Sequence, residues 1–450
     1  MDFANIKSIH FVGIGGIGMS GIAEVLAERG VKVSGCDLRP SAASDLLAAR
    51  RGVHVSIGHD PSHLAGVDLV VVTSAIRGPN AEVEAARAQG IPVVKRKEIL
   101  GALVGDKRAL GVSGTHGKTT TSAMIAVILE EAGLDPTIII GGMLRNIGAN
   151  AKNGAGQFAV VEADEYDRSF HDLHPEIAVV TNVEADHLEY YRSFEAIVEA
   201  FRIFVQGVKP GGAVVGCIDD PVVASLLDRV EHRVIRYGLS SSAELRATNI
   251  SFDERGSRFE IPGIGWFRLF VPGEHNVRNA LAAIAVAREL KIPNAVTAAA
   301  LAKFLGVDRR FQILGDYAGA LIVDDYAHHP TEIRATLVAA RAGYPNRRIV
   351  ALFQPHLYSR TRDFAREFGE SLKVADVALV APIYAAREQP IEGISARMIA
   401  DAVDGVEFLE HSNEEIVDEL RKRLRPNDLF ITLGAGDVYE ISEALAEANP

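Results

Sequence analysis

Residues 109–121 read ALGVSGTHGKTTT, an apolar run followed by glycines, a lysine and three threonines. A strand that ends in a glycine loop before a helix can hold nucleotide phosphates with backbone N–H groups and a lysine. Lys118 would reach the β- and γ-phosphates of ATP, and the Thr119 hydroxyl would bind Mg²⁺. The usual P-loop has glycine where this chain has Val112. The alternative, that Lys118 merely begins a helix, leaves the glycines unexplained.

Acidic and histidine side chains follow the next two apolar runs. Glu162 comes directly after FAVV, and His187 comes a few residues after IAVVTN. If both runs are strands of one parallel sheet, their carboxyl ends lie at the edge that carries the glycine loop. Glu162 and His187 would then be able to hold Mg²⁺ over the triphosphate. The alternative is that both belong to solvated acidic loops.

A second glycine loop, Gly13-Ile14-Gly15-Gly16-Ile17-Gly18, stands between an apolar run and a helical pattern near the N-terminus. Glycines let the backbone approach a diphosphate, and the helix N-terminus adds partial positive charge. Taken alone, the loop would indicate NAD, with Asp37 at the end of the next strand holding a ribose. A tight turn without any ligand is the alternative.

The composition narrows the class of protein. A length of 450 residues suggests about three domains, and 48% hydrophobic with 24% charged residues is typical of a globular protein. The net charge of −12 argues against a nucleic-acid partner. Two cysteines cannot form a disulfide framework and fit a reducing compartment. The longest uncharged run, residues 8–23, is shorter than the ~20 apolar residues of a membrane helix, and no secretory signal is visible. We therefore expect a cytoplasmic protein without membrane insertion.

Short apolar runs alternate with helical patterns along most of the chain, which predicts an α/β protein with mostly parallel sheets covered on both faces. The runs form three groups, and we predict domains at residues 1–105, 106–309 and 310–450. Residues 250–271, ISFDERGSRFEIPGIGWFRLFV, alternate in a β-like manner and predict a small antiparallel insertion in the central domain.

Asn276 and Asn279 are three residues apart at the start of an alanine-rich helical pattern. They would share one helix face, and their amides could pair with the edge of an adenine. Alternatively, Asn276 caps this helix.

Charged and aromatic residues open the third group. Arg310 could add positive charge to the phosphates, and Asp325 ends the first apolar run. His356 and Arg360 follow the next run, and arginine is suited to binding both oxygens of a substrate carboxylate. Surface charge and a capped loop are the alternatives.

Together these segments resemble the Mur ligases, over essentially the whole chain. In chain order the resemblance rests on HFVGIGGIGMSGIAEVL, GTHGKTTTSAMIA, EADEYDRSF, TNVEADHLEYY, PGEHNVRNALAA, DRRFQ, DDYAHHPTEI, FQPHLYSRTRDF and LGAGDV. The resemblance implies an N-terminal Rossmann-like domain for a UDP moiety, a central P-loop ATPase-type domain, and a C-terminal Rossmann-like domain for an amino acid. It therefore replaces NAD by a UDP substrate at the first glycine loop.

The resemblance also implies roles for individual residues. Catalytic roles fall to Lys118, Glu162, His187, Arg310 and His328. ATP contacts fall to Gly114, Thr115, His116, Gly117, Lys118, Thr119, Thr120, Asn276, Asn279, Arg310 and Asp325, with Asp325 at the ribose. Substrate contacts fall to Gly13, Gly15, Gly16, Ile17, Gly18, Ser74, Tyr326, His328, His356 and Arg360. Metal binding falls to Thr119, Glu162 and His187.

The segments resemble most the branch of the family that joins L-alanine to UDP-N-acetylmuramate in peptidoglycan precursor synthesis. That branch implies ATP and Mg²⁺ as cofactors, an acyl-phosphate intermediate, and a monomer or weak homodimer. Many members have arginine where this chain has Leu357, so Arg360 or Arg362 must suffice for the alanine carboxylate. Residues 200–202 lack the lysine that other Mur ligases carbamylate, as is common in this branch.

Three other functions stay open at this point. A related ligase that adds an intact tripeptide shares most of these segments. An NAD-dependent oxidoreductase would leave GTHGKTTT unexplained, and a non-catalytic nucleotide-binding module would leave Glu162 and His187 without a role.

Overall fold

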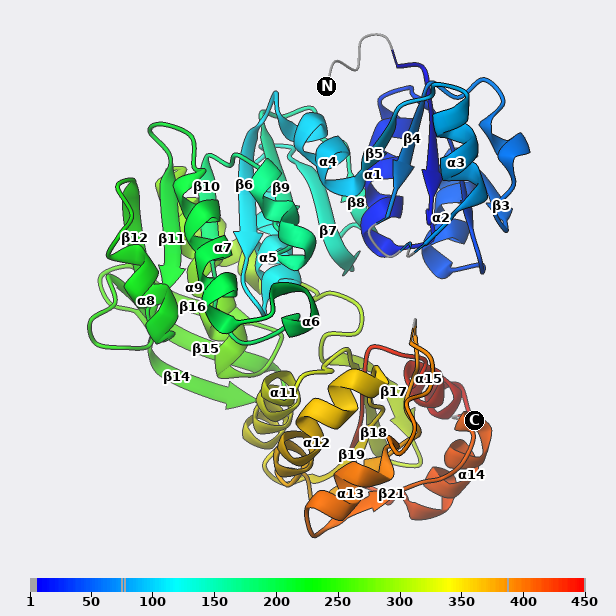
Figure 1. Ribbon diagram of the computed structural model, residues 1–450. Coiled ribbons are helices and arrows are strands. Elements are labelled where there is room, and N and C mark those ends of the chain that lie inside the picture. Colours follow the sequence, from blue (N-terminus) through cyan, green and yellow to red (C-terminus); the bar gives the residue numbers. More distant parts are fainter. Residues whose placement is uncertain (1–5, 74–75, 77, 387, 449–450) are drawn as a thin grey trace. The chain divides into compact units, whose positions relative to one another are not determined.

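The computed structural model describes residues 6–73, 76, 78–386 and 388–448 (Figure 1). By its internal contacts the chain divides into two compact units. Unit 1 comprises residues 1–248, 261–264 and 278–304, and unit 2 comprises residues 249–260, 265–277 and 305–450. Within the described ranges, every helix is too short or too polar to cross a lipid bilayer.

Unit 1 begins with a five-stranded parallel sheet in the order β3-β2-β1-β4-β5. Its strands are β1 (Ser8–Val12), β2 (Lys32–Asp37), β3 (His54–Ile57), β4 (Leu69–Val72) and β5 (Val93–Lys95). The helices between them are α1 (Ile17–Glu28), α2 (Ala42–Arg51), η2 (Pro61–Leu64), α3 (Ala81–Ala88) and α4 (Arg96–Val104). All of β1 is buried, as expected for a central strand with both faces covered.

The second sheet of unit 1 has eight strands in the order β13-β12-β11-β10-β6-β9-β7-β8. Only β7 and β8 pair in antiparallel fashion among its described strands. The strands are β6 (Arg108–Ser113), β7 (Thr137–Leu144), β8 (Ala149–Lys152), β9 (Phe158–Glu162), β10 (Ile177–Val180), β11 (Ala213–Cys217), β12 (Arg233–Gly238) and β13 (Leu245–Arg246). As a result, β6 lies between β9 and β10, and the carboxyl ends of these three strands are neighbours.

Seven helical segments belong to this part of the described chain, and α5 is the one that follows the glycine loop. They are α5 (Lys118–Glu131), η3 (Tyr166–Asp172), α6 (Leu188–Tyr191), α7 (Phe194–Gln206), α8 (Pro221–Leu227), α9 (Glu274–Glu289) and α10 (Asn294–Ala302). The α5 helix is buried continuously from Thr119 to Leu129, so it packs as a core helix against the sheet. Because α9 begins at Glu274, Asn276 lies inside the helix, so the alternative that Asn276 caps it is excluded.

Unit 2 contains a three-stranded sheet of β14 (Thr248–Asp253), β15 (Gly256–Ile261) and β16 (Gly265–Leu269). The two connections span only a few residues, which antiparallel strands allow and parallel strands do not. The predicted small antiparallel sheet is therefore confirmed.

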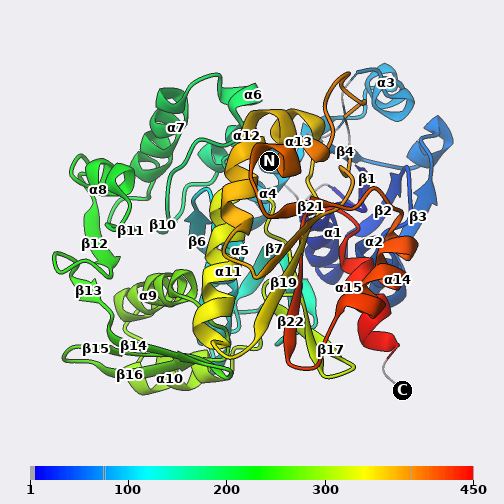
Figure 2. The same cartoon turned by 90° about the horizontal axis from the view of Figure 1, so that it is seen from below.

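The main sheet of unit 2 has six strands in the order β17-β18-β22-β19-β20-β21, parallel except for the pair β17–β18. Its strands are β17 (Gln312–Tyr317), β18 (Ala320–Asp325), β19 (Arg348–Phe353), β20 (Val377–Val380), β21 (Val406–Phe408) and β22 (Asp428–Leu433). Its helices are α11 (Pro330–Gly343), α12 (Tyr358–Leu372), α13 (Arg397–Ala402), α14 (Asn413–Arg423) and α15 (Tyr439–Glu447). Figure 2 shows α11 and α12 on one side of the sheet and α14 and α15 on the other, matching two separate apolar cores.

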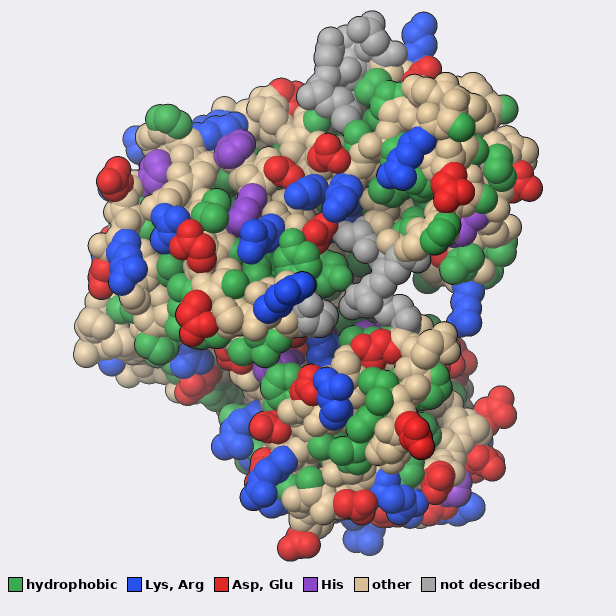
Figure 3. All heavy atoms as spheres, viewed as in Figure 1, with side chains coloured by type: hydrophobic (Ala, Val, Ile, Leu, Met, Phe, Trp, Pro, Cys, Tyr) green, Lys and Arg blue, Asp and Glu red, His purple; other side chains and the backbone are tan. Residues whose placement is uncertain are grey.

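The α/β fold class, with mostly parallel sheets and a Rossmann-like arrangement at either end of the chain, is thus confirmed. On the surface, acidic and basic side chains are interspersed over the face of unit 2 seen in Figure 3.

Candidate active site

The glycine loop after β6 is held in a conformation that only glycine adopts easily. Gly114 has φ of +141° and Gly117, the N-cap of α5, has φ of +84°. A Cβ on Gly114 would lie 1.9 Å from Thr181 Oγ1, and one on Gly117 would lie 2.6 Å from Asn279 Oδ1. The glycines therefore allow close packing against the end of β10 and against α9, and the loop leads directly into the N-terminus of α5, where backbone N–H groups can bind an anion.

Lys118, the first residue of α5, is paired with Glu165. Its Nζ lies 2.9 Å from Oε1 and 2.8 Å from Oε2 of Glu165, and it donates to the carbonyl oxygens of Gly114 and Thr115 at 2.5 and 3.2 Å. Burial lowers the pKa of Lys118, but the carboxylates of Glu165 and Asp164 more than offset it, so that pKa lies above its usual value. Lys118 is thus a charged, positioned ammonium group.

Glu165, the ion-pair partner of Lys118, is a candidate site residue that the sequence did not single out. Its side chain is only 5% exposed, and its backbone oxygen accepts a hydrogen bond from Tyr191 Oη at 2.5 Å. The segment EADE at the end of β9 was the available signal, but it contains three acidic residues, and only the fold selects one of them as the partner of Lys118.

The predicted metal residues lie at the ends of the three neighbouring strands. Thr119 follows the loop after β6 and is 8% exposed. Glu162 ends β9, and its Oε1 accepts a hydrogen bond from the Gly141 N–H at 2.6 Å. His187 follows β10 with a left-handed backbone, φ +55°, and its ring centroid lies 5.0 Å from that of Tyr166. The hydroxyl and carboxylate are donors of the kind Mg²⁺ prefers, with the imidazole as a further donor.

Asn279 and Asn276 are both buried, but they fall in different units. Asn279 belongs to unit 1, where its Oδ1 accepts a hydrogen bond from Thr121 Oγ1 at 3.2 Å beside the glycine loop. Asn276 belongs to unit 2, where its Nδ2 donates to the Pro272 oxygen at 2.7 Å. The adenine role stays a prediction for both.

The first glycine loop joins β1 to α1, as predicted, and is organised by Asp37. Gly13 has φ of +86°, and Gly15 N–H donates to Asp37 Oδ2 at 2.9 Å. Gly16 is the N-cap of α1 and Ile17 its first residue, while a Cβ on Gly18 would meet Arg96. Because Asp37 holds the loop itself, its presence is explained without the ribose of NAD. Ser74, a predicted substrate contact, lies outside the described residues.

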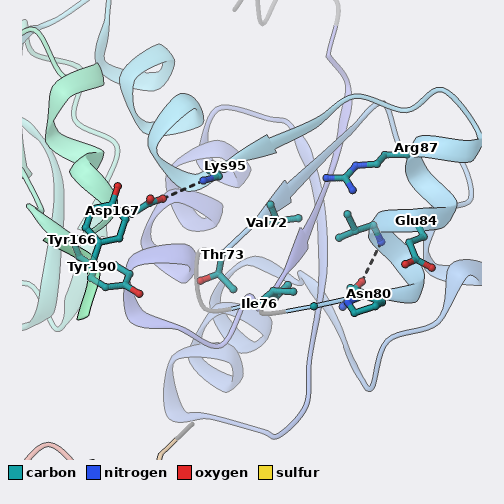
Figure 4. A pocket seen from close by; sticks show the side chains of 13 residues that line it. Val72, Thr73, Ile76, Asn80, Glu84, Arg87, Lys95, Tyr166, Asp167 and Tyr190 are labelled. Carbon is teal, nitrogen blue, oxygen red and sulfur yellow. Dashed lines mark hydrogen bonds and ion pairs between the residues drawn. The ribbon is translucent and has the colours of Figure 1, made fainter. Parts of the chain in front are cut away.

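A cavity of about 290 Å³ adjoins this loop (Figure 4). A Cβ on Gly13 would lie 2.5 Å from Thr73, which lines the cavity together with Arg87. Lys95 and Asp167 also line it and form an ion pair at 3.3 Å. Sequence reasoning missed Arg87 and Lys95, because they come from α3 and β5 and read as ordinary surface charge.

The turn just before β17, at the start of the main sheet of unit 2, holds two neighbouring arginines in different surroundings. Arg309 is tied into the fold, donating to Asp324 Oδ2 at 2.9 Å and to the Gly434 oxygen at 2.8 Å. Arg310 stands over the Tyr326 ring at 5.3 Å, and its side chain is 31% exposed. Its Nη1 lies 3.8 Å from Glu332 Oε1, beyond hydrogen-bonding distance, so Arg310 is less firmly tied into the fold than Arg309.

Asp325, predicted to contact the ATP ribose, is a buried residue at the end of β18. Its oxygens accept hydrogen bonds from the backbone N–H groups of Phe311 at 2.7 Å and Ala327 at 2.8 Å. Burial raises the pKa of Asp325 to about 6 against the lowering effect of Arg310 and of these N–H groups. Asp325 therefore fixes the two turns that carry Arg310 and Tyr326.

The predicted amino-acid contacts form a chain of rings in unit 2. The His328 ring centroid lies 5.3 Å from that of Tyr326 and 6.0 Å from that of His356. His328 Nδ1 is 3.0 Å from the Tyr326 oxygen, while His329 instead packs against Phe364. The fold thus brings Tyr326, His328 and His356 together, as expected.

The start of α12 carries the candidate carboxylate ligands. Leu357 is buried with φ of +75°, an unusual conformation for a non-glycine residue of the kind found at functional sites. Arg360 follows in the first turn of α12 and is half-buried. Arg362 is exposed and pairs with Asp363 at 2.7 Å, and Arg360, which is less exposed, stays the predicted carboxylate ligand.

Models of three protein families match successive parts of the chain. Residues 8–108 match "Mur ligase family, catalytic domain", residues 112–287 match "Mur ligase middle domain", and residues 309–436 match "Mur ligase, glutamate ligase domain".

Similar proteins extend over the whole chain. A UDP-N-acetylmuramate–L-alanine ligase of Syntrophotalea carbinolica is 46% identical, with 99% of this chain and 98% of the relative covered. The crystal structure of UDP-N-acetylmuramate-alanine ligase MurC from Thermotoga maritima matches with a TM-score of 0.84 at 30% identity, covering 98% of each chain. A murein peptide ligase from Psychrobacter arcticus also covers 98% of each chain, with a TM-score of 0.75 at 26% identity. The resemblance that the sequence segments predicted is therefore confirmed, and this chain belongs to the Mur ligase family.

Proposed function

We propose that this protein is an ATP-dependent ligase that joins L-alanine to the lactyl carboxylate of UDP-N-acetylmuramate through an acyl phosphate, in peptidoglycan precursor synthesis. The observation that carries the proposal is the charged Lys118 at the N-terminus of α5, beside the ends of β9 and β10. The choice of substrates is supported by the 46% identity to L-alanine ligases over 99% of the chain.

In this proposal ATP binds at the loop of residues 114–120, with its phosphates on the N–H groups at the start of α5 and on Lys118. Glu165 holds the Lys118 ammonium group in place until the phosphates arrive. Asn276, Asn279, Arg310 and Asp325 keep their predicted roles at the adenine, phosphates and ribose.

Mg²⁺ fits the donor set of Thr119, Glu162 and His187. The Gly141 N–H fixes one oxygen of the Glu162 carboxylate, which orients that side chain at the strand end. Bound Mg²⁺ would neutralise negative charge on the phosphates.

The chemistry needs little more than positioning and charge neutralisation from the protein. The lactyl carboxylate attacks the γ-phosphate, ADP leaves, and the amine of L-alanine then attacks the acyl phosphate to release inorganic phosphate. Lys118 and Arg310 would stabilise the charge that moves between these groups. His187 or His328 would accept the proton that the amine loses.

The two remaining ligands would lie in different parts of the chain. The UDP moiety would occupy the glycine loop at residues 13–18 and the adjoining cavity, with Arg87 and Lys95 as cations for its phosphates. L-Alanine would lie near Tyr326, His328, His356 and Arg360. We further propose the domain boundaries 1–105, 106–309 and 310–450, a cytoplasmic location, and a monomer or weak homodimer.

Phosphate release with ATP, Mg²⁺, UDP-N-acetylmuramate and one of several amine substrates tests this function. L-Alanine should give the highest kcat/KM, above glycine, L-serine and an L-alanyl tripeptide. Preference for the tripeptide would make the protein a recycling ligase, and release without any amine substrate would leave only a nucleotide hydrolase.

Charge removal at the metal residues should weaken the response to Mg²⁺. Glu162→Gln keeps the acceptor for the Gly141 N–H but removes the negative charge, and His187→Ala removes the imidazole. Each should raise the Mg²⁺ concentration for half-maximal activity by about ten- to a hundredfold. The exposed Glu244→Gln is the matched control. An unchanged Mg²⁺ titration in both variants would contradict the metal assignment.

Loss of the Arg360 side chain should weaken the binding of the amino-acid substrate and leave the binding of the other two substrates nearly unchanged. A charge-assisted contact to a carboxylate contributes roughly 1.5–3 kcal/mol, so Arg360→Ala should raise the KM for L-alanine by about ten- to a hundredfold. The KM values for ATP and UDP-N-acetylmuramate should change much less. Arg362→Ala, which removes the neighbouring exposed arginine, should leave all three values near those of the wild type. Steady-state kinetics with each substrate varied in turn decide the matter, and an unchanged alanine KM in Arg360→Ala rejects the role.

A further inference from the structure

The N-terminal sheet contains a group of ionisable side chains that the proposed function does not use. We call it the N-terminal polar cluster, and it consists of His10 from β1, Cys36 from β2, His63 from η2 and Glu82 from α3. One ring nitrogen of each histidine, the thiol sulfur and a carboxylate oxygen all lie within 4.8 Å of one another.

The cluster is buried among apolar side chains. Cys36 and Glu82 are 0% exposed and His10 is 1% exposed, while the His63 side chain is 21% exposed. Cys36 shares an apolar core with side chains of β1, β4 and α3. A carboxylate in such a place is costly unless positive charge and hydrogen bonds compensate it.

Glu82 stands at the centre of the cluster. Its Oε2 lies 2.7 Å from Cys36 Sγ, and its Oε1 contacts His63 Nδ1 and accepts from the Asp60 N–H at 3.1 Å. The carboxylate therefore faces the thiol on one side and an imidazole on the other.

His10 is aimed into the same space. Its Nδ1 is 2.9 Å from Ser34 Oγ, which fixes the ring. Its Nε2 lies 3.7 Å from Glu82 Oε1, beyond hydrogen-bonding distance, and has no hydrogen-bond partner among the described residues. A buried ring nitrogen with no such partner, turned toward a carboxylate and a thiol, is the arrangement expected of a metal ligand.

We propose that the N-terminal polar cluster binds one Zn²⁺ ion. One sulfur, two imidazole nitrogens and one carboxylate oxygen make up a four-ligand set that suits tetrahedral zinc. A thiolate and a carboxylate together cancel the double positive charge of the ion, so the buried site becomes neutral. Tetrahedral zinc separates its ligand atoms by about 3.3–3.6 Å, so only small side-chain adjustments are needed.

The neighbouring groups fit a supporting role. His59 Nδ1 lies 3.2 Å from Cys36 Sγ and 3.3 Å from Glu82 Oε2, where it can orient both ligands. The partly exposed His63 provides an entry path for the ion. All four ligands are protein side chains, which makes this a structural site rather than a catalytic one.

Zinc at this position would brace the first glycine loop. The Cys36 backbone oxygen accepts hydrogen bonds from the N–H groups of Gly13 at 2.9 Å and Ile14 at 3.1 Å. The ion would thus join β1, β2, η2 and α3 directly beneath the loop.

The test is zinc retention by the full-length protein. The protein is loaded with Zn²⁺ in a buffer with excess Mg²⁺, desalted, and analysed for metal. The wild type should retain about one zinc per chain, and Cys36→Ser and Glu82→Gln less than about a tenth of that. Cys217→Ser, which changes the other buried cysteine, should retain as much as the wild type. With Co²⁺ in place of Zn²⁺, an intense thiolate-to-cobalt absorption should appear in the wild type and in Cys217→Ser, and be absent from Cys36→Ser.

His63→Ala covers the case in which the buried variants fail to fold, because His63 is partly exposed. This variant should also lose the zinc, and a chelator should lower the melting temperature of the wild type until Zn²⁺ is restored. Absence of zinc from the loaded wild type would overturn the proposal and leave a purely hydrogen-bonded cluster. Equal zinc retention in the wild type, Cys36→Ser and His63→Ala would overturn it as well.

Discussion

Lys118→Ala should lower the rate of phosphate release by about a thousandfold or more, because it removes the charged group that the proposed function places at the transferred phosphoryl group. The ammonium group is positioned by Glu165 and by the Gly114 oxygen, so no other side chain can take its place without a rearrangement of the loop. The measurement is kcat with all three substrates saturating.

The ion pair with Glu165 complicates the single variant. Removing Lys118 leaves a 5% exposed carboxylate without its partner, and breaking a buried pair from one side destabilises a protein by about 3–5 kcal/mol. The double variant Lys118→Ala/Glu165→Gln removes both charges and should recover much of the stability without any of the activity. Lys303→Ala, at an exposed ion pair in the same unit, is the control and should behave as the wild type. Near-normal turnover in the folded double variant would contradict the assignment of Lys118.

The sequence predicts those parts of the site that are formed by residues adjacent to one another in the chain. The loop that begins at residue 114 lies between the buried strand β6 and the buried helix α5, and it contains two glycines at positive φ. Each of these features can be predicted from the local residue types. Strand order follows less directly, but apolar runs between helices require a parallel sheet, and that places the ends of β9 and β10 beside the loop.

The parts that the sequence does not predict depend on which side chains the fold brings together. Glu165 is 47 residues from Lys118, and nothing local distinguishes it from Asp164. Likewise, Arg309 and Arg310 are adjacent in the sequence and both lie over the Tyr326 ring, yet only Arg309 donates to Asp324 and to the Gly434 oxygen. The N-terminal polar cluster draws on four elements, and each of its residues alone reads as a core or surface position.

The glycine at position 114 offers a sharper test of the loop geometry than any charged residue. Gly114→Ala forces a Cβ to within 1.9 Å of Thr181 Oγ1 and 3.1 Å of the Asn182 nitrogen, at φ of +141°. A left-handed backbone strains a non-glycine residue by roughly 1–2 kcal/mol, and overpacking a tight contact adds about 1–3 kcal/mol. We expect a loss of about 2–5 kcal/mol in the free energy of unfolding, together with a loss of at least about tenfold in ATP affinity, because the N–H groups of the loop are displaced.

Gly133→Ala separates the two contributions. Gly133 also has a positive φ, +71°, but a Cβ there would meet no atom within 4 Å. Its substitution should therefore destabilise the protein only by the backbone strain and should leave ATP binding unchanged. In Gly114→Ala/Thr181→Ala the clashing hydroxyl is gone, so part of the lost stability should return. Denaturant unfolding and ATP titration of the three variants provide the comparison. If Gly114→Ala were no less stable than Gly133→Ala, the close packing of the loop against the end of β10 would be wrong, and with it the reason why glycine is required at this position.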